Sequence, residues 1–445
     1  MRSDSLPKVL AISLSTWHID SGIHTQTDLF KFWNCDKVAQ IYLKSGLPNT
    51  PVCNKFFQIS ENAIIYSVLN RKPVGKRVTN TTEVNDSDKK AIEAEKKLYK
   101  KAHKKKSWFM TLVREIVWGL GKWKTKQLDE FVKEFDADVY FVPIYPYVYT
   151  AKIQQYILRK FPKPYVCYLA DDNYSYMTCG SNIFAYIHRF FLRRVVKDLA
   201  TNCDEMFTIT KIEAIDTDNL FGTNSVVLTK GIDYSKLSFR QKPVNKPIKM
   251  VYTGNLLIGR ASSLVEISKA MKEINANGEK IVFDIYSTTV LDDKTTNWLN
   301  SNGCHYHKPV PKSQVAEIQN SADIVVFAES LEKKHKNDAR LSFSTKLTDY
   351  FASGKCIFAI GDKNIAPIQY LQENDSAIIC TDYSQIKDNL QMLIDDTDKI
   401  TEYCKKAFDC GKANHNQETV KKVFIDTIVR ASDKDSCDGT NDKSC

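Results

Sequence analysis

Two stretches in the second half of the chain carry residues suited to binding an anion. In the first, an apolar run ends in a turn that contains Gly254, Asn255, Gly259 and Arg260 and opens a helical pattern. Small residues let backbone N–H groups approach an anion, and the start of a helix adds a partial positive charge. The turn resembles the phosphate loop GxxxxGK(S/T), but Arg260 replaces the Lys and Ala261 replaces the Ser or Thr. Because the hydroxyl group that holds magnesium is missing, the turn argues against a nucleoside triphosphatase.

The second stretch begins with an apolar run, residues 322–329, that predicts a buried strand. Glu329 stands at its carboxyl end, where open α/β sheets bind their ligands. A hydrophilic loop, residues 331–340, leads to a second helix start, whose polar residues are Ser342, Ser344, Thr345 and Lys346. Asp349 follows one turn later, and we expect it to reach neutral hydroxyl groups beside a bound phosphate.

Hydroxyl groups, free N–H groups and an ammonium group at one helix start form an anion site. The alternative is that Ser344 and Thr345 only cap the helix and that Lys346 is a solvated charge. Two helix starts suited to phosphate in one domain, one with Arg260 and the other with Lys346, favour the functional interpretation. We therefore predict that these two cations converge on the same pyrophosphate.

The elements that position these residues follow the pattern of an α/β protein with mostly parallel sheets, because short apolar runs alternate with helical stretches. The strands predicted in the first half are residues 8–15, 39–43, 138–144, 164–170, 205–210 and 225–229. Helical stretches between them include residues 25–33, 151–161 and 187–201. A polar segment with two prolines, residues 238–249, indicates a linker. The strands predicted beyond it are residues 248–254, 280–287, 305–310, 322–329, 355–361 and 376–381.

A chain of 445 residues favours two domains. We expect an N-terminal domain over residues 1–240, with a basic and aromatic insertion at 75–126, and a C-terminal domain over residues 247–414. The final helical stretch, residues 415–430, follows the second sheet. Residues 431–445 are polar and without periodicity, which predicts a disordered tail.

The composition excludes several classes of protein. Hydrophobic residues make up 43% of the chain and aromatic residues 11%, so the chain is not disordered as a whole. Twelve Cys without a CxxC pair and eight His without HExxH argue against a disulfide scaffold and a zinc site. No apolar run is long enough to span a membrane, and the first residues lack the pattern of a secretory signal. We therefore expect a cytoplasmic protein.

The net charge of +10 is concentrated in one segment. Residues 89–106 hold nine Lys and two Glu, a net charge of +7, which leaves only +3 for the rest of the chain. A basic excess confined to one stretch predicts a local anionic partner. Binding of nucleic acid is disfavoured, because aromatic residues do not interleave with these lysines as stacking platforms would.

An amphipathic helix is predicted directly after the lysines. Its apolar stripe is formed by Phe109, Leu112, Val113, Ile116, Val117 and Leu120, and the indoles beside it are Trp108, Trp118 and Trp123. One interpretation is an in-plane anchor, in which Lys89–Trp123 binds an anionic membrane surface at the inner face of the plasma membrane. The other is an ordinary helix that packs its stripe on the domain core. The sequence leaves both open.

These features together resemble the GT-B fold glycosyltransferases, in particular family four and its capsular or exopolysaccharide relatives. The resemblance extends over residues 8–430 and is carried by the two α/β halves, the turn at 254–260 and the segments 322–329 and 344–361. It implies two Rossmann-like domains that face each other across a cleft, with the acceptor bound by the first and a nucleotide-sugar by the second. It also implies that the last helix crosses back to the first domain.

By position, the resemblance assigns a role to each residue of the second half. Arg260 and Lys346 would bind the donor diphosphate, with Gly254, Asn255, Ser344 and Thr345 around it. Glu329 would lie near the sugar hydroxyls, Asp349 would hold the ribose, and Val310 would offer its backbone to the base. The chain departs from the family in having Asp349 where Glu is usual, Ser287 where Gly is commoner, and a longer interval between Glu329 and Asp349.

The first half supplies candidates for the acceptor side. Gly22 and His24 occupy the loop after the first predicted strand, and His24 either contacts the acceptor or caps the next helix. Asp171 and Asp172 follow another strand, where one of them could accept a proton or both could form a turn.

The implied reaction is transfer of a sugar from a nucleotide-sugar donor to a membrane-associated glycan or a lipid-linked acceptor. The family implies retention of configuration, and the positive charge of Arg260 and Lys346 predicts a reaction without metal or other cofactor. Two alternatives remain from the sequence: a nucleotide-sugar epimerase of the same fold, and a protein that binds sugar nucleotides or anionic lipid without catalysis.

Overall fold

The computed structural model describes residues 5–18, 25–82, 108–335 and 337–438, together with Lys89, Ile92 and Glu93. Most of the lysine-rich run at 89–106 therefore lies outside the described residues. The chain forms two compact units. One comprises Met1–Leu228 and Lys421–Cys445, and the other comprises Thr229–Val420.

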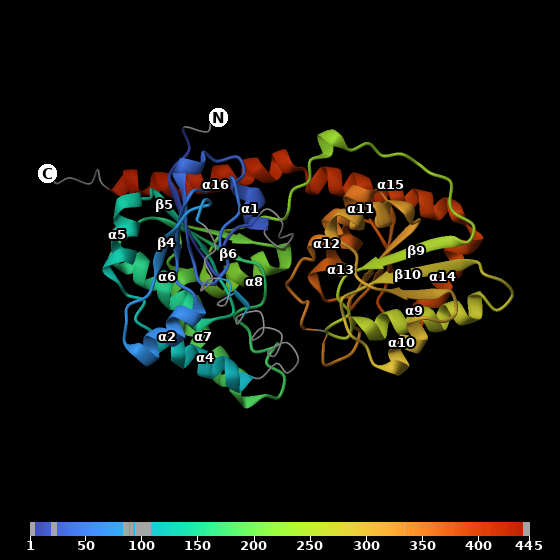
Figure 1. The fold of residues 1–445 in the computed structure, drawn as a ribbon. Coiled ribbons are helices and arrows are strands. Elements are labelled where there is room, and N and C mark those ends of the chain that lie inside the picture. Colours follow the sequence, from blue (N-terminus) through green and yellow to red (C-terminus); the bar gives the residue numbers. More distant parts are fainter. Residues whose placement is uncertain are drawn as a thin grey trace. The chain divides into compact units, whose positions relative to one another are not determined.

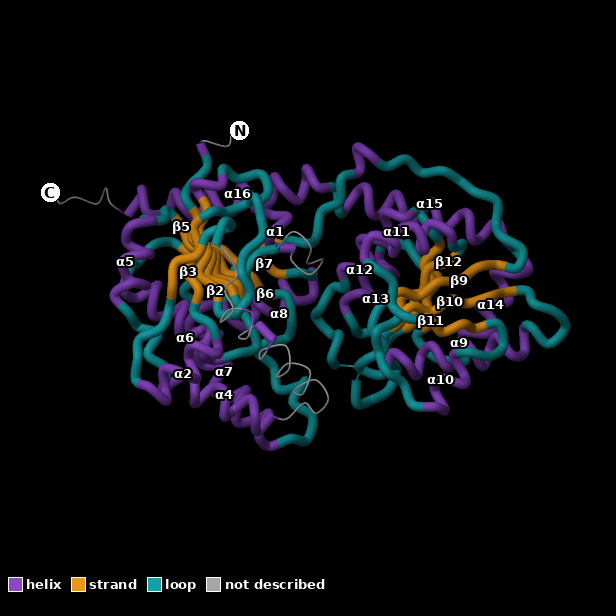
Figure 2. The backbone as a smooth tube through the Cα atoms, in the orientation of Figure 1, coloured by secondary structure: helices purple, strands orange, loops and turns teal. Residues whose placement is uncertain are grey.

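The first unit is built on a sheet whose described strands follow the order β4-β3-β2-β1-β5-β6-β7-β8 (Figures 1 and 2). All neighbours are parallel except β3 and β4, which are antiparallel at the edge. The strands are β1 (Val9–Ser13), β2 (Val38–Tyr42), β3 (Lys55–Gln58), β4 (Lys76–Val78), β5 (Val139–Pro143), β6 (Tyr165–Leu169), β7 (Glu205–Thr208) and β8 (Ser225–Val227).

Helices cover both faces of this sheet, so the central strands are apolar on both sides. In β5, Tyr140 and Val142 face the larger core, which also holds residues of α5, α6 and α7, while Phe141 faces α1 and α16. The helices of the unit are α1 (Thr25–Phe30), α2 (Glu61–Asn70), α4 (Trp108–Leu120), α5 (Lys126–Phe135), α6 (Val148–Lys160), α7 (Ile183–Thr201), α8 (Lys211–Phe221) and the greater part of α16 (Gln417–Asp438), with a 3-10 turn at Cys35–Lys37.

The final helix α16 returns to the first unit, as the resemblance implied. Phe424 lies in an aromatic cluster with ring centroids 5.0 Å from Phe30, 5.9 Å from Phe141 and 5.7 Å from Phe207. The helix extends to Asp438, so the prediction of a disordered tail from residue 431 is wrong for the residues up to this point.

The reason for the longer helix is a set of contacts with the start of β7. Arg430 forms two hydrogen bonds of 2.8 Å with the carboxylate of Glu205. One turn further, the Lys434 ammonium donates to the backbone carbonyl of Asp204 at 2.6 Å, and the side chain of Ala431 is buried. Periodicity in a polar sequence does not reveal such contacts, because they depend on a strand more than two hundred residues earlier.

The helix predicted after the lysines is α4, and it combines features of both interpretations. Trp118 and Trp123 are buried in the core of the first unit. Within the predicted stripe, however, Phe109, Ile116 and Leu120 are exposed at 54%, 62% and 64%. The helix therefore packs on the domain, but part of its apolar stripe faces outward.

The second unit contains a parallel sheet whose described strands follow the order β11-β10-β9-β12-β13-β14 (Figure 2). The strands are β9 (Ile248–Thr253), β10 (Ile281–Tyr286), β11 (Cys304–His307), β12 (Ile324–Ala328), β13 (Cys356–Ile360) and β14 (Ile378–Cys380). The helices are α9 (Arg260–Ile274), α10 (Asp293–Leu299), α11 (Lys312–Ser321), α12 (Thr345–Ser353), α13 (Ala366–Glu373), α14 (Gln385–Asp395) and α15 (Thr397–Asn414), with a 3-10 turn at Tyr234–Lys236. The predicted α/β class and the two Rossmann-like parallel sheets are thus confirmed.

The chain enters the second unit at Thr229, ahead of the expected boundary at residue 240. The Thr229 hydroxyl and the His415 ring share a hydrogen bond of 2.9 Å, and the backbone N–H of Ile232 donates to the His415 carbonyl at 2.8 Å. These contacts tie the segment before the proline-containing linker to the end of α15. Proline content marks the linker, but it does not show where the chain changes its packing partners.

Candidate functional site

The predicted anion site lies where the strand order of the second sheet reverses. From β9 the chain proceeds outward through β10 and β11, and then returns to place β12 on the other side of β9. Gly254 follows β9 and Glu329 follows β12, so both stand at the carboxyl edge of adjacent parallel strands. Open α/β sheets bind ligands at such a switch point.

The turn after β9 requires two glycines. Gly254 has φ +143°, and a Cβ atom there would collide with the side chain of Lys346. Gly259 has φ +73°, and a Cβ atom there would collide with the Ser330 side chain. Both positions therefore need a residue without a side chain, for backbone conformation and for space. The turn predicted from its small residues is present, and it brings the backbone close to the neighbouring ammonium group.

Arg260, the first residue of α9, is held by Asn255, which was predicted beside it, and by Glu329, which was predicted near the sugar hydroxyls. Its Nε and Nη2 atoms donate to the two carboxylate oxygens of Glu329 at 3.0 and 2.7 Å, and Nη1 donates to Asn255 Oδ1 at 2.9 Å. The side chains of the ion pair are only 16% and 7% exposed. Burial alone would lower the pKa of Arg260, but the Glu329 charge and the paired hydrogen bonds raise it. The guanidinium is thus a fixed cation at the edge of the sheet.

Lys346 lies in the first turn of α12, and its ammonium contacts Tyr252 of β9. Nζ is 3.2 Å from the Tyr252 hydroxyl oxygen and 4.5 Å from the centroid of the ring. Burial and repulsion by Arg260 lower the pKa of Lys346 to about 8, although Glu329 partly opposes this shift. Because Arg260 repels the Lys346 ammonium, the two cations lie close to each other. An anion placed beside both would relieve this repulsion.

Tyr252 links the two cations, and sequence reasoning missed it. Its hydroxyl donates to the Asn255 carbonyl at 2.6 Å and accepts from Lys346, while Asn255 also accepts from Arg260. The sequence gives no signal for this role, because Tyr252 occupies an ordinary position in an apolar strand. Ser263 was also missed; its buried hydroxyl donates to the Glu329 carbonyl at 2.7 Å.

Two helices begin at this site, and neither start is capped by a side chain in the described structure. The position before α9 is Gly259, which has no side chain, and the position before α12 is Ser344, whose hydroxyl makes no capping hydrogen bond. Ser344 and Thr345 occupy the cap and first-turn positions that the sequence predicted, but the simple capping role of Ser344 is wrong. Neither helix start thus has a side-chain oxygen of its cap residue in the place where an anion could accept from backbone N–H groups.

Asp349 is engaged by a lysine that the sequence analysis did not consider. Lys230 Nζ lies 2.6 Å from Asp349 Oδ1, and the two side chains are 24% and 49% exposed. The backbone around Lys230 is fixed by the contacts of Thr229 and Ile232 with His415. The prediction that Asp349 holds the ribose stays a prediction. A ribose bound at this position would share the Asp349 carboxylate with Lys230.

The remaining donor-side residues lie at the same edge of the sheet. Val310 is in the loop after β11. Strand β10 lies between β11 and β9 in the sheet. Ser287 follows β10 and is buried, and its Oγ accepts from the backbone N–H of Thr289 at 3.1 Å. The Thr289 hydroxyl accepts from the backbone N–H of Leu256 at 2.9 Å, so this loop supports the turn that carries Arg260.

The acceptor-side predictions have mixed outcomes. Gly22 and His24 lie outside the described residues. Asp172 forms a turn: its Oδ1 accepts from the backbone N–H groups of Tyr174 and Ser175, at 3.3 and 2.8 Å. Asp171 is exposed to water. Protein atoms around its carboxyl group nevertheless reduce its hydration, and this loss, together with the charge of Asp172, raises the pKa of Asp171 to about 6. Asp171 is thus the better candidate for exchange of a proton.

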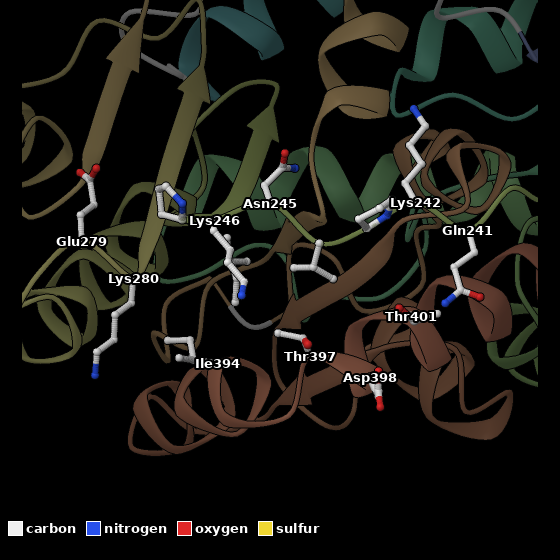
Figure 3. Close-up of a pocket in the computed structure, with 14 residues that line it drawn as sticks. Gln241, Lys242, Asn245, Lys246, Glu279, Lys280, Ile394, Thr397, Asp398 and Thr401 are labelled. Atoms are coloured by element: carbon white, nitrogen blue, oxygen red, sulfur yellow. The ribbon is translucent and has the colours of Figure 1, made fainter.

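A hollow of about 930 Å³ in the second unit lies elsewhere (Figure 3). Its walls come from the linker, from the residues before β10 and from the junction of α14 and α15, and include Lys246, Lys280 and Thr397. The linker precedes β9 and Glu279 and Lys280 precede β10, so the hollow stands at the amino ends of these strands. It is therefore separate from the site of Arg260 and Lys346.

Comparison with known proteins supports the fold. No protein-family model and no curated protein sequence matches the chain. Among solved structures, it is similar to TarM, with a TM-score of 0.60 and 8% identity over 96% of this chain and 100% of that one. It is also similar to Anabaena HepE in complex with UDP, with a TM-score of 0.58 and 10% identity over 95% and 99% of the two chains. A third is the trehalose 6-phosphate synthase of Burkholderia multivorans, with a TM-score of 0.57 and 9% identity over 99% and 100%. The fold is the GT-B fold.

Proposed function

We propose that the protein is a glycosyltransferase that moves a sugar from a nucleotide-sugar donor to a membrane-associated glycan or a lipid-linked acceptor. The observation that carries the proposal is the meeting of Arg260 and Lys346, joined by Asn255 and Tyr252, at the switch point of the second sheet. The HepE structure with UDP supports a nucleotide as the ligand of a fold of this kind.

The two cations suit the departure of a nucleoside diphosphate. When the bond between the sugar carbon and the phosphate oxygen breaks, negative charge grows on that oxygen, and fixed cations near it lower the barrier. Burial, and after it repulsion by Arg260, lower the pKa of Lys346, so a negative charge beside Lys346 would stabilise its ammonium form. A diphosphate supplies this charge, and the stabilisation increases as the leaving group gains charge in the transition state.

In the reaction we propose, the acceptor oxygen forms the new bond to the sugar carbon on the face that the diphosphate leaves. The hydroxyl proton of the acceptor passes to the departing phosphate oxygen, so that configuration is retained without a protein base. Asp171→Asn is then expected to slow transfer much less than loss of either cation. A dominant effect of Asp171→Asn would contradict this route.

The cations also favour a reaction that needs no metal ion. Arg260 and Lys346 supply the positive charge that magnesium gives to diphosphate in other enzymes. Glu329, the acidic side chain closest to Arg260, is already occupied by that residue. Turnover is expected to persist in excess chelator. Loss of turnover in chelator with rescue by magnesium would contradict this part of the proposal.

The central experiment is transfer of label from radioactive UDP-sugars, and then from other nucleotide-sugars, to a membrane extract. Arg260→Ala and Lys346→Ala are each expected to lower transfer by about 10²- to 10³-fold, as removal of one preorganised charge partner does in other enzymes. Arg240→Ala, an exposed arginine of the linker, is the control and should transfer as the unaltered protein does. Isomerised donor without transfer would indicate an epimerase, and binding without turnover would indicate a non-catalytic protein.

A further inference from the structure

Helix α4 has its charged residues inside and part of its apolar surface outside. Arg114 pairs with Glu61 of α2 at 2.5 Å, with the side chains 21% and 18% exposed. The carboxylate of Glu115 accepts from the backbone N–H groups of Val148 and Tyr149, both at 2.8 Å, at the start of α6. Its Oε1 atom is also 3.1 Å from His188 Nε2 of α7. The charged side chains thus fix α4 onto three neighbouring helices.

Four apolar residues of α4 are exposed, although Trp118 of the same helix is buried. Phe109, Met110, Ile116 and Leu120 are exposed at between 54% and 64%. A helix that only needed to pack on the domain would bury these side chains and expose its charges. The reversed arrangement is costly, because it buries ionic groups and leaves apolar surface in water.

The exposed surface continues onto the helices beside α4, which Figure 1 shows next to it. The ring of Phe109 contacts that of Phe184 at the start of α7, with centroids 5.6 Å apart. Further along α7, Phe190 and Phe191 are exposed at 46% and 49%, and on α2 Leu69 is exposed at 76%. Scattered exposed hydrophobic residues are ordinary, but several on three helices that pack on one another indicate an interaction surface.

A groove of about 1440 Å³ runs along this surface between α4, α6 and α7. Part of its lining is aromatic: Trp118 and Tyr149 are stacked with their centroids 4.3 Å apart, and Phe191 also borders it. Among the described residues that line the groove, the one carboxylate is that of Glu115, which is already hydrogen-bonded, whereas the cations are Arg71, Lys122, Lys124, Lys152, Arg159 and Lys160.

Four of these cations have no acidic partner in the described part of the chain. Arg159 pairs with Asp198 and Lys160 with Asp129. No ion pair with a described residue is formed by the other four, Arg71, Lys122, Lys124 and Lys152. The groove therefore joins uncompensated positive charge to exposed apolar and aromatic surface. This combination matches an anionic amphiphile, whose phosphate needs cations and whose chains need apolar contact.

We propose that the groove and the exposed residues of α2, α4 and α7 form a binding surface for anionic phospholipid at a bilayer. Lysine and arginine side chains of the groove hold headgroup phosphates, while Ile116, Leu120 and the phenylalanines of α7 enter the interfacial layer. The surface lies in the first unit and uses none of the residues of the diphosphate site. It explains how an enzyme of the proposed function is held where lipid-linked acceptors are found.

The test is flotation of the full chain with vesicles of phosphatidylcholine alone or of phosphatidylcholine with phosphatidylglycerol, each at two salt concentrations. We expect binding to the anionic vesicles only, weaker at high salt. Lys122→Ala/Lys152→Ala should weaken the binding by about 5-fold per lysine, and Ile116→Ser/Leu120→Ser by at least about tenfold. The matched controls are Lys133→Ala/Lys363→Ala, exposed lysines elsewhere, and Ile215→Ser/Leu220→Ser on α8, which should bind as the unaltered protein does.

Every preparation is also tested for UDP binding, which reports on folding and on the diphosphate site. Equal flotation of the variants and their controls, or no flotation at all, would overturn the lipid surface while leaving the proposed transferase intact. A second copy of the chain is the competing occupant of this face. Sedimentation tests this alternative. If the chain forms a dimer that Ile116→Ser/Leu120→Ser abolishes and that anionic vesicles do not dissociate, the face is a dimer interface and the lipid proposal is wrong.

Discussion

The ion pair of Arg260 and Glu329 balances a buried charge, and this links the stability of the site to ligand binding in a way that can be measured. Glu329→Gln removes the carboxylate charge and leaves the guanidinium with a neutral partner. We expect the free energy of unfolding of the second unit to fall by about 1–3 kcal/mol, the range for hydrogen bonds to charged groups. Saturating UDP should reduce this loss, because its phosphate supplies the missing negative charge.

Thermal unfolding with and without UDP measures both effects. Glu279→Gln, at an exposed position before β10, serves as the control and should change neither curve. An equal loss of stability with and without UDP would mean that the nucleotide does not contact Arg260.

Lys346 predicts a pH dependence of binding whose direction follows from its lowered pKa. The pKa of Lys346 is about 8, so the ammonium is mostly charged at neutral pH and loses its proton as the pH rises through this value. A bound diphosphate favours the charged form and raises the pKa. Affinity for UDP should therefore be constant below about pH 7 and fall by up to about tenfold per unit above pH 8.

Calorimetry in buffers of different ionisation enthalpy should show that UDP binding takes up protons near pH 8. Lys346→Ala should bind more weakly and without this decline, whereas Lys346→Arg should restore the charge and also remove the decline. A decline that persists in Lys346→Ala would assign the titration to another group.

At the scale of elements, the sequence predicts regular structure where apolar periodicity is strong. Every predicted strand, from β1 to β14, is present, but β3 and β4 were missed. Strand β4 reads Lys-Arg-Val, with two charged residues of three, and it forms only because β3 offers an open antiparallel edge. A pairing of this kind depends on the neighbour and leaves no pattern in the strand itself.

In the candidate site, too, the sequence predicts the features that depend on local residues and misses those that depend on distant partners. The turn with Gly254 and Arg260 and the helix start with Lys346 were predicted, because small residues and helix caps act locally. Tyr252 and Lys230 were not, because each matters through a partner distant in sequence. Residues that bind through local backbone geometry can be found from sequence, and residues that position others require the folded chain.

Helix α16 gives a prediction for a single element. Phe424 is fully buried against Phe30, Phe141 and Phe207, so it fixes the end of the chain onto the first sheet. Phe424→Ala should lower the stability of the first unit by about 3–5 kcal/mol, the usual cost of such a truncation. Lys422→Ala, an exposed position on the same helix, is the control. Hydrogen exchange resolves the effect: faster exchange should appear in β5 and β7, and no change in β5 would contradict the packing role.

At the scale of the whole molecule, charge and apolar surface are distributed unevenly. The lysine-rich run before α4 holds most of the net charge, and the cationic groove belongs to the same unit, while the candidate diphosphate site belongs to the other. Among the described residues, no helix is both long enough and apolar enough to cross a bilayer. In the two proposals made above, attachment to a surface belongs to the first unit and catalysis to the second.

This separation predicts a double dissociation. Arg260→Ala should float with anionic vesicles as the unaltered protein does but transfer sugar about 10²- to 10³-fold more slowly, because its lipid surface is intact and its diphosphate site is not. Ile116→Ser/Leu120→Ser should bind UDP normally and hydrolyse the donor at the unaltered basal rate, yet transfer sugar poorly to an acceptor embedded in vesicles. The same variant should be rescued when the acceptor is presented in detergent, since attachment to the bilayer is then no longer needed. If the rescue fails while UDP binding is normal, the exposed face of α4 serves the reaction itself, and the two functions are not separable.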